Sequence, residues 1–118
     1  MAKIYKILTA ADWRAMQAAG RFDGSADDRR DGFVHLSARD QLVSTLTKHF
    51  QDQDNLLLLA IDDSALAANA LKWEPSRGGA KFPHLYGPLP LAAVAWSAPL
   101  GWADDGCPVL PTRINADG

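Results

Sequence analysis

Two short segments of this chain each set a histidine in an apolar run and place a hydroxyl side chain two residues further on. They read Asp-Gly-Phe-Val-His-Leu-Ser over residues 31–37 and Phe-Pro-His-Leu-Tyr-Gly over residues 82–87. Residues two apart on an extended chain point to the same side. If both runs are extended, His35 lies beside Ser37 and His84 beside Tyr86. These segments therefore favour short strands that carry polar side chains into an otherwise apolar layer.

The remaining patterns predict an α+β chain of five or six short strands and two main helices. We expect strands over residues 4–8, 32–36, 56–62, 71–74 and 91–97, and helices over 10–19 and 37–50. Thr9 with Asp12, and Ser37 with Asp40, have the spacing of a helix N-terminal capping box. Ser37 is thus expected to begin the second helix, in addition to any contact with a ligand. The charged residues 21–31 are interpreted as an exposed loop.

Size and composition fit a single globular domain. The chain has 118 residues, of which 47% are hydrophobic and 22% charged, as in ordinary globular proteins. We expect one compact domain over residues 1–100 and an irregular tail over 101–118. The longest apolar run, residues 56–61, is too short to cross a bilayer. With a net charge of −2, the chain lacks the basic excess that nucleic-acid binding requires.

Cys107 is the only cysteine, so the chain cannot form an internal disulfide. This fits a reducing compartment, and the first residues show no apolar secretory segment. We therefore expect a cytoplasmic protein. The sequence does not indicate its oligomeric state.

Four polar residues interrupt the predicted strands and are the candidate catalytic residues: His35, Glu74, His84 and Tyr86. Burying such a group without a partner costs roughly 1–3 kcal/mol, so they should contact one another or a ligand. Ser37, Arg77 and Lys81 are candidate contacts to a bound nucleotide, since Arg77 and Lys81 could hold one phosphate. Structural roles stay open for all of them, including a histidine bonded to backbone and a loop of solvated charges.

These residue types are compatible with three chemistries to different degrees. Ser37 lacks a nucleophile-elbow motif, which argues against acyl transfer. His35, His84 and Glu74 form a possible metal-ligand set, but their spacing is not that of a known motif, and no metal is expected. Two His-x-Ser/Thr motifs characterise the two-histidine phosphoesterases, which act on cyclic phosphates. The first motif matches through Ser37, and Tyr86 departs from the pattern in the second.

Taken together, the motifs resemble the bacterial family called domain of unknown function 952. The resemblance rests on the Ile-Tyr-Lys-Ile segment over 4–7, Trp13, the first histidine segment with Gln41, Lys-Trp-Glu over 72–74, and the second histidine segment. It covers about residues 4–96. The resemblance implies a compact fold similar to that of the ADP-ribosyltransferases, in which two small, mostly antiparallel sheets form a cleft for NAD.

Within that resemblance, His35 would hold the ribose, Tyr86 would be an aromatic platform, and Glu74 would stabilise an oxocarbenium ion. The order of Glu74 and Tyr86 is the reverse of the usual one, and His84 has no counterpart. NAD is thus a possible cofactor or substrate rather than an assigned one. The alternative is a non-catalytic module that binds a small molecule or a partner in the same cleft.

Overall fold

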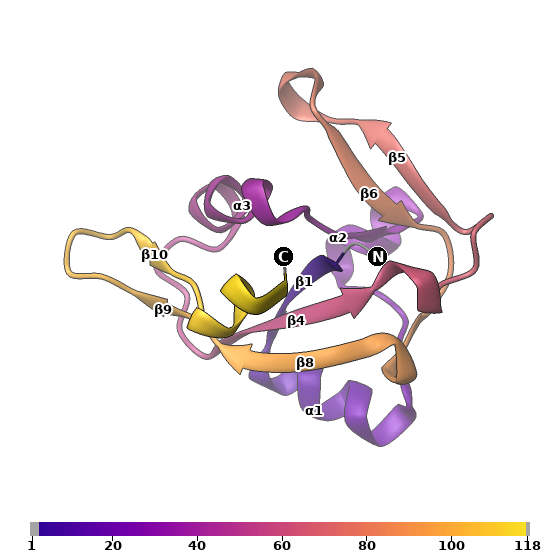
Figure 1. The fold of residues 1–118 in the computed structure, drawn as a ribbon, viewed down its shortest axis with the longest axis horizontal. Coiled ribbons are helices and arrows are strands. Elements are labelled where there is room, and N and C mark those ends of the chain that lie inside the picture. Colours follow the sequence, from indigo (N-terminus) through magenta and orange to yellow (C-terminus); the bar gives the residue numbers. More distant parts are fainter. Residues whose placement is uncertain (1–2, 118) are drawn as a thin grey trace.

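Residues 3–117 are described by a computed structural model (Figure 1). The helices are α1 (Ala10–Ala19), α2 (Ala26–Asp31) and α3 (Leu42–His49). The strands are β1 (Lys3–Thr9), β2 (Arg21–Phe22), β3 (Val34–His35), β4 (Leu56–Asp62), β5 (Leu71–Pro75), β6 (Lys81–Leu85), β7 (Leu89–Pro90), β8 (Val94–Pro99), β9 (Gly101–Trp102) and β10 (Pro108–Val109). Short 3-10 segments cover Arg39–Gln41, Asp63–Ala65, Arg77–Gly79, Leu91–Ala93 and Thr112–Asp117.

The central sheet has the antiparallel order β1-β4-β8. Successive residues of β4 enter opposite cores: Leu59 and Ile61 pack in a cluster that includes Met16 of α1, whereas Leu58 and Ala60 pack with Leu42 and Leu46 of α3. A strand that is buried on both faces needs a continuous apolar run. The predicted buried strand over 56–62 is therefore confirmed, and its burial on both faces accounts for its apolar sequence.

Local signals also place α1 as expected. The hydroxyl of Thr9 accepts a hydrogen bond from the backbone N–H of Asp12 at 3.1 Å. Gly20 ends the helix with φ of +80°, a left-handed conformation that glycine adopts without a side-chain penalty. The predicted beginning and end of this helix are confirmed.

A second antiparallel sheet has the order β3-β6-β5, and its β5–β6 hairpin projects from the body of the domain (Figure 1). His35 and His84 are direct partners in the register of β3 and β6. The chain then joins the central sheet through an isolated bridge, in which the backbones of Ser37 and Tyr5 exchange hydrogen bonds of 2.8 and 2.9 Å. This bridge brings His35 close to Lys6, the residue after Tyr5.

Two expectations about residues 21–50 are wrong. The expected loop over 21–31 contains α2, which begins with a capping box between Ser25 and Asp28, and Asp28 is buried. Ser37 does not cap a helix, because its backbone pairs with Tyr5 and its hydroxyl lies 3.3 Å from that of Thr45. Ala38 instead precedes the 3-10 turn, and α3 begins at Leu42.

The segment expected to be an irregular tail, 101–118, contains two strands and a 3-10 segment within its described residues, 101–117. β9 and β10 form a short hairpin, and Ile114 is buried in the same cluster as Trp96. Asp117 accepts hydrogen bonds from the Tyr5 hydroxyl at 2.7 Å and from Trp96 Nε1 at 3.1 Å. These partners lie far away along the chain, so composition alone gives no sign of them. Gly118 lies outside the described residues.

The predicted α+β class with small antiparallel sheets is thus confirmed. Within residues 3–117, no helix has the length and apolar character needed to cross a membrane.

Candidate functional site

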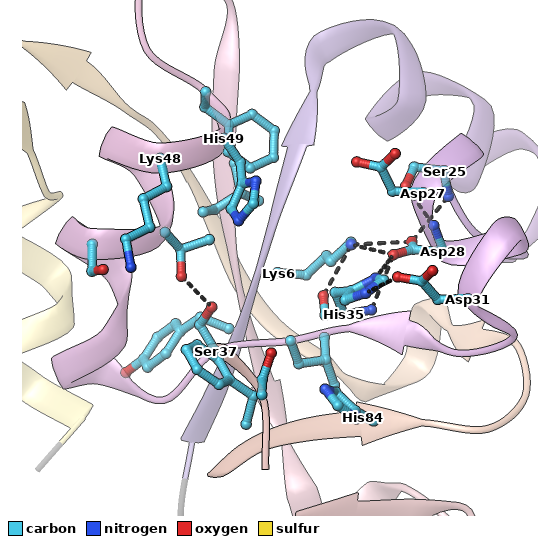
Figure 2. A pocket seen from close by; sticks show the side chains of 18 of the residues that line it. Lys6, Ser25, Asp27, Asp28, Asp31, His35, Ser37, Lys48, His49 and His84 are labelled. Carbon is cyan, nitrogen blue, oxygen red and sulfur yellow. Dashed lines mark hydrogen bonds and ion pairs between the residues drawn. The ribbon is translucent and has the colours of Figure 1, made fainter. Parts of the chain in front are cut away.

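A pocket of about 240 Å³ lies between α2 and α3, and β1, β3 and β6 contribute to its walls (Figure 2). One side carries the charged residues of α2 together with His35. The other side carries the polar residues of α3. The polar residues that line the pocket include Lys6, Asp27, Asp28, Arg30, Asp31, His35, Ser37, Ser44, Thr45, Lys48, His49, Ser76 and His84.

Asp28 connects several residues on the charged side of the pocket. Its Oδ1 accepts the backbone N–H of His35 at 3.0 Å and lies 2.6 Å from His35 Nδ1. Its Oδ2 accepts the backbone N–H of Ser25 at 2.9 Å and the Lys6 ammonium at 3.1 Å. Burial raises the pKa of Asp28, but the His35 hydrogen bond, the Lys6 charge and the backbone donors outweigh it. The pKa therefore lies well below its usual value, and Asp28 is an anion at neutral pH.

Lys6 reaches this carboxylate from inside the domain. Its side chain is 8% exposed, and its ammonium also donates to the His35 carbonyl oxygen at 3.0 Å. Burial lowers the pKa of Lys6, although the nearby Asp28 opposes that shift. Lys6 thus links β1 to both the helix α2 and the strand β3, and it fixes the position of His35.

Both imidazole nitrogens of His35 face carboxylates. Nδ1 lies 2.6 Å from Asp28 and Nε2 lies 2.9 Å from Asp31. A neutral imidazole has one N–H, so it can donate to only one of them, whereas an imidazolium donates to both. Arg30 also contacts Asp31 at 3.2 Å, and its hydrogen bond lowers the pKa of that carboxyl. The two carboxylates therefore hold the His35 ring from both sides.

His84 has a different environment. Its side chain is 7% exposed, and Nδ1 lies 2.9 Å from Oε1 of Glu74. The same oxygen accepts the Tyr86 hydroxyl at 2.7 Å. The hydrogen bonds from Tyr86 and His84 lower the pKa of Glu74, and the bond to Glu74 raises the pKa of Tyr86. Among the side chains that the structure describes, which exclude that of Arg77, no hydrogen-bond partner is found for Nε2 of His84.

Phe33 holds the two histidines at a fixed separation. Its ring stacks on His84 with a centroid distance of 3.9 Å, and it contacts His35 at 4.7 Å. The two imidazoles themselves are 5.9 Å apart and inclined by 69°. They therefore lie at the same end of one pocket, as Figure 2 shows, with different hydrogen-bond partners.

The residues proposed from the sequence are distributed unevenly around this pocket. His35, His84 and Ser37 line it. Glu74 and Tyr86 are not among the lining residues and contact His84 instead. Lys81 is exposed outside the lining, and its carbonyl oxygen accepts from Gln41 at 2.7 Å. The side chain of Arg77 lies outside the described part of the structure.

Sequence reasoning missed Lys6, Asp28, Asp31 and Lys48. One signal was present: Lys6 stands inside an apolar alternating strand, where a charged side chain needs a buried partner. Ser25 and Asp28 also have capping-box spacing. Nothing local shows that Asp28 and Asp31 turn toward His35, because that depends on how α2 packs. Across residues 3–117, no group of three histidine, cysteine or carboxylate side chains is placed to hold a metal ion.

The fold and the pocket define a small α+β protein with a buried charge network beside two paired histidines. The family model for DUF952, described as a protein of unknown function, matches residues 7–97. The chain therefore belongs to the DUF952 family.

Solved structures of a Caulobacter crescentus protein, CC0527, are similar to it. In the comparison with the crystal structure, the sequence identity is 50%, the alignment covers 96% of this chain and 98% of CC0527, and the TM-score is 0.89. The solution NMR structure is 53% identical over 92% of each chain, with a TM-score of 0.81. No curated protein gives a significant match.

Proposed function

We propose that the pocket binds a small phosphate-bearing metabolite and that His84 transfers a proton to or from it. The observation that carries the proposal is the arrangement of the His84 ring. Nδ1 is held by Glu74 at 2.9 Å, whereas Nε2 has no partner among the described residues. His84 also lines the pocket. Nε2 is thus the ring atom that remains for a ligand.

A carboxylate that accepts a hydrogen bond from one imidazole nitrogen fixes which tautomer the ring adopts. Glu74 accepts a hydrogen bond from Nδ1–H, so Nε2 carries the lone pair when the ring is neutral. The hydroxyl of Tyr86 in turn fixes Glu74. This is the orienting arrangement that general-base histidines use in hydrolases and transferases. Glu74 and Tyr86 would then act through His84 without touching the ligand.

An anionic ligand is favoured by what faces His84 in the pocket. Each aspartate of the wall already contacts a cation: Asp27 and Asp31 contact Arg30, and Asp28 contacts Lys6. Lys48 makes no ion pair with any residue over 3–117. It extends from α3 beside the hydroxyls of Ser44 and Thr45, which suit phosphate oxygens.

The size of the pocket limits the ligand. Sites for drug-sized ligands measure about 300–1,000 Å³, and this pocket measures about 240 Å³. It would accommodate a phosphorylated sugar or one half of a dinucleotide rather than a whole NAD molecule. We propose that the ligand is a nucleotide or a similar phosphate ester and that the protein binds it in the cytoplasm.

NAD binding with ADP-ribosyl transfer is a more specific form of this proposal, and it has less support. It assigns Glu74 to the ribose carbon and Tyr86 to the nicotinamide face, yet neither residue lines the pocket. The ADP-ribosyltransferase-like fold rests on resemblance alone. In this form, Glu74 would have to leave His84 before it could act on the substrate.

Hydrolysis of a cyclic phosphate is a second candidate. It is favoured by the direct pairing of His35 and His84 across β3 and β6, with ring centroids 5.9 Å apart. Two imidazoles at this separation could serve as base and acid at one phosphorus. The hydroxyl of Ser37 lines the same pocket. The hydroxyl of Tyr86 is bonded to Glu74 and does not line it.

The test is a titration of labelled protein with AMP, ADP-ribose, NAD and 2′,3′-cyclic AMP, followed by imidazole nitrogen NMR and thermal unfolding. A ligand at one hundred times its dissociation constant stabilises by about 2.7 kcal/mol, or a rise of about 10 °C in Tm for this size. Adenosine, which has no phosphate, is the matched control. We expect His84 Nε2 to respond most strongly and adenosine to have little effect.

Product formation separates the alternatives. Conversion of the cyclic phosphate favours the two-histidine chemistry, and release of nicotinamide favours ADP-ribosyl transfer. Binding without any product identifies a non-catalytic module. Glu74→Gln should slow any turnover while the phosphate ester still binds, because Glu74 is placed to orient His84. If none of the four compounds binds, the proposal is wrong.

A further inference from the structure

We infer that two copies of this chain associate through the edge strand β5, forming one continuous sheet across a twofold axis at Trp73. β5 is the outer strand of the β3-β6-β5 sheet, and its hairpin projects from the domain (Figure 1). The Trp73 side chain is a large apolar group that is 45% exposed. An exposed edge strand offers unpaired backbone groups to another strand.

The backbone register shows which groups of β5 point outward. Ala70 accepts a hydrogen bond from the N–H of Tyr86 at 2.7 Å, so this pair faces inward. Pairs in an antiparallel ladder alternate between bonded and non-bonded. Lys72 and Glu74 therefore bond toward β6, whereas Leu71 and Trp73 direct their N–H and C=O groups away from it. Trp73 lies opposite Pro83, which has no N–H to offer.

The side chains of β5 are complementary to a second copy of the same strand. With Trp73 opposite its own counterpart, Lys72 of one copy lies opposite Glu74 of the other. Opposite charges at directly opposed positions stabilise a pair of strands. The two tryptophans meet on the other face, because residues alternate along a strand. The hydrogen bonds that Glu74 makes with His84 and Tyr86, among the described residues, both use Oε1, so Oε2 is the oxygen that faces the second copy's ammonium in this pairing.

The charges of Lys72 and Glu74 select one register. A shift that sets Leu71 opposite Trp73 of the second copy keeps the backbone bonds but places Lys72 opposite itself. Like charges at directly opposed positions destabilise a pair. A shift in the other direction places Glu74 opposite itself, which is again a pair of like charges. The register centred on Trp73 avoids both like-charge pairs. It also sets Leu71 opposite Pro75, where the Leu71 N–H bonds the Pro75 carbonyl and Pro75 has no N–H to return the bond.

The association links the two pockets. Glu74 orients His84 through Nδ1 at 2.9 Å, and the second copy's ammonium would lie beside that same carboxylate. The strand is short, with five residues, so the contact is small and the dimer is expected to be weak and concentration-dependent. The inference does not depend on the proposed function, since it uses only β5.

Sedimentation equilibrium from low micromolar to near millimolar concentration tests the inference. We expect a monomer–dimer equilibrium that Trp73→Lys weakens by about 30-fold or more, the effect of removing a central aromatic anchor. Lys72→Glu should weaken it as well, and less so at high salt, because it sets two carboxylates opposite each other. Val43→Lys is the matched control, since Val43 on α3 is 49% exposed and away from the edge.

Circular dichroism checks that each variant keeps its fold. A monomer at all concentrations, or a dimer that Trp73→Lys leaves intact, overturns the inference. A dimer that Val43→Lys abolishes as strongly as Trp73→Lys also overturns it, since the contact then lies elsewhere. Binding of an extended peptide along β5 by a monomeric protein would show that the edge serves a different occupant, and would overturn it too.

Discussion

Replacement of Lys6 by methionine should destabilise the protein far more than replacement of Lys3, although both lysines lie on β1 and pair with an aspartate. The Lys6–Asp28 pair is buried, with side chains 8% and 2% exposed and a separation of 3.1 Å. At an effective dielectric constant near 20, two unit charges at that distance attract by about 5 kcal/mol. The cost of removing both ions from water offsets part of this attraction.

Removing one partner leaves the other charge buried, which typically costs about 3–5 kcal/mol. Asp28 keeps its bonds to His35 and Ser25 in the variant, so we expect a loss near the lower end, about 3 kcal/mol. Lys3 and Asp62 are 22% and 35% exposed at 3.3 Å. Lys3→Met should therefore cost about 0–1 kcal/mol, the range for surface pairs.

Urea unfolding measures both values. With a slope of about 1.5 kcal/mol per molar, Lys6→Met should lower the midpoint by about 2 M. The double variant Lys6→Met with Asp28→Asn has no buried charge and should be more stable than the two separate losses predict, by about 2 kcal/mol. Equal effects of Lys6→Met and Lys3→Met, or strict additivity in the double variant, would refute the reasoning.

Three further predictions concern other parts of the chain. Asp117→Ala removes the acceptor of the buried Tyr5 hydroxyl and of Trp96 Nε1, and should cost about 1–3 kcal/mol in thermal unfolding; Asp105→Ala on the exposed hairpin is the control, and equal losses would contradict the assignment. The depressed pKa of Asp28 means that its contribution is complete above its unfolded pKa of about 3.9 and is lost as the pH falls below that value. Asp28→Asn should flatten this acid limb of the stability curve, and an unchanged limb would show that other carboxyls dominate. Gly32→Ala should cost about 1–2 kcal/mol through backbone strain alone, because φ is +86° and no atom lies within 4 Å of an added Cβ; a neutral effect on the unfolding midpoint would contradict it.

The elements that could be predicted are those whose signals are local. The strand over 56–62 is apolar throughout, and such a run requires burial on both faces. The first helix has its cap at Thr9 and its end at Gly20 within the same short segment. In both cases the residues that determine the element are the residues of the element itself.

α2 could not be predicted from its own residues. Its sequence, Ala-Asp-Asp-Arg-Arg-Asp, has no apolar periodicity, and so short a helix is unstable in isolation. What stabilises it is Asp28, which bonds to Lys6 and His35 at sequence separations of 22 and 7 residues. The prediction that Ser37 caps a helix was wrong for the opposite reason. Its capping-box spacing was a valid local signal, but pairing with Tyr5 determined the backbone conformation of Ser37.

The candidate site was predicted in part. The sequence predicted that His35, Glu74, His84 and Tyr86 share one cleft. His35 and His84 line the pocket because their strands are directly opposed, whereas Glu74 and Tyr86 lie outside its lining. The aspartates were not predicted, since they reach the pocket from a helix that the sequence did not reveal. The placement of Glu74 beside His84 follows from the β5–β6 hairpin, where Glu74 and Phe82 are partners and His84 is two residues further on.

The different partners of the two histidines suggest which contact a ligand would change. Asp28 is 2% exposed and accepts hydrogen bonds from four donors, so its carboxylate would lose all of these bonds if it moved away from His35. Asp31 is 35% exposed and keeps Arg30 as a partner at 3.2 Å if it leaves His35. An anion entering the pocket would therefore replace Asp31 at Nε2 of His35, while Asp28 continues to hold Nδ1. His35 would then contact the ligand through Nε2, and His84 is the residue that we propose exchanges a proton with it.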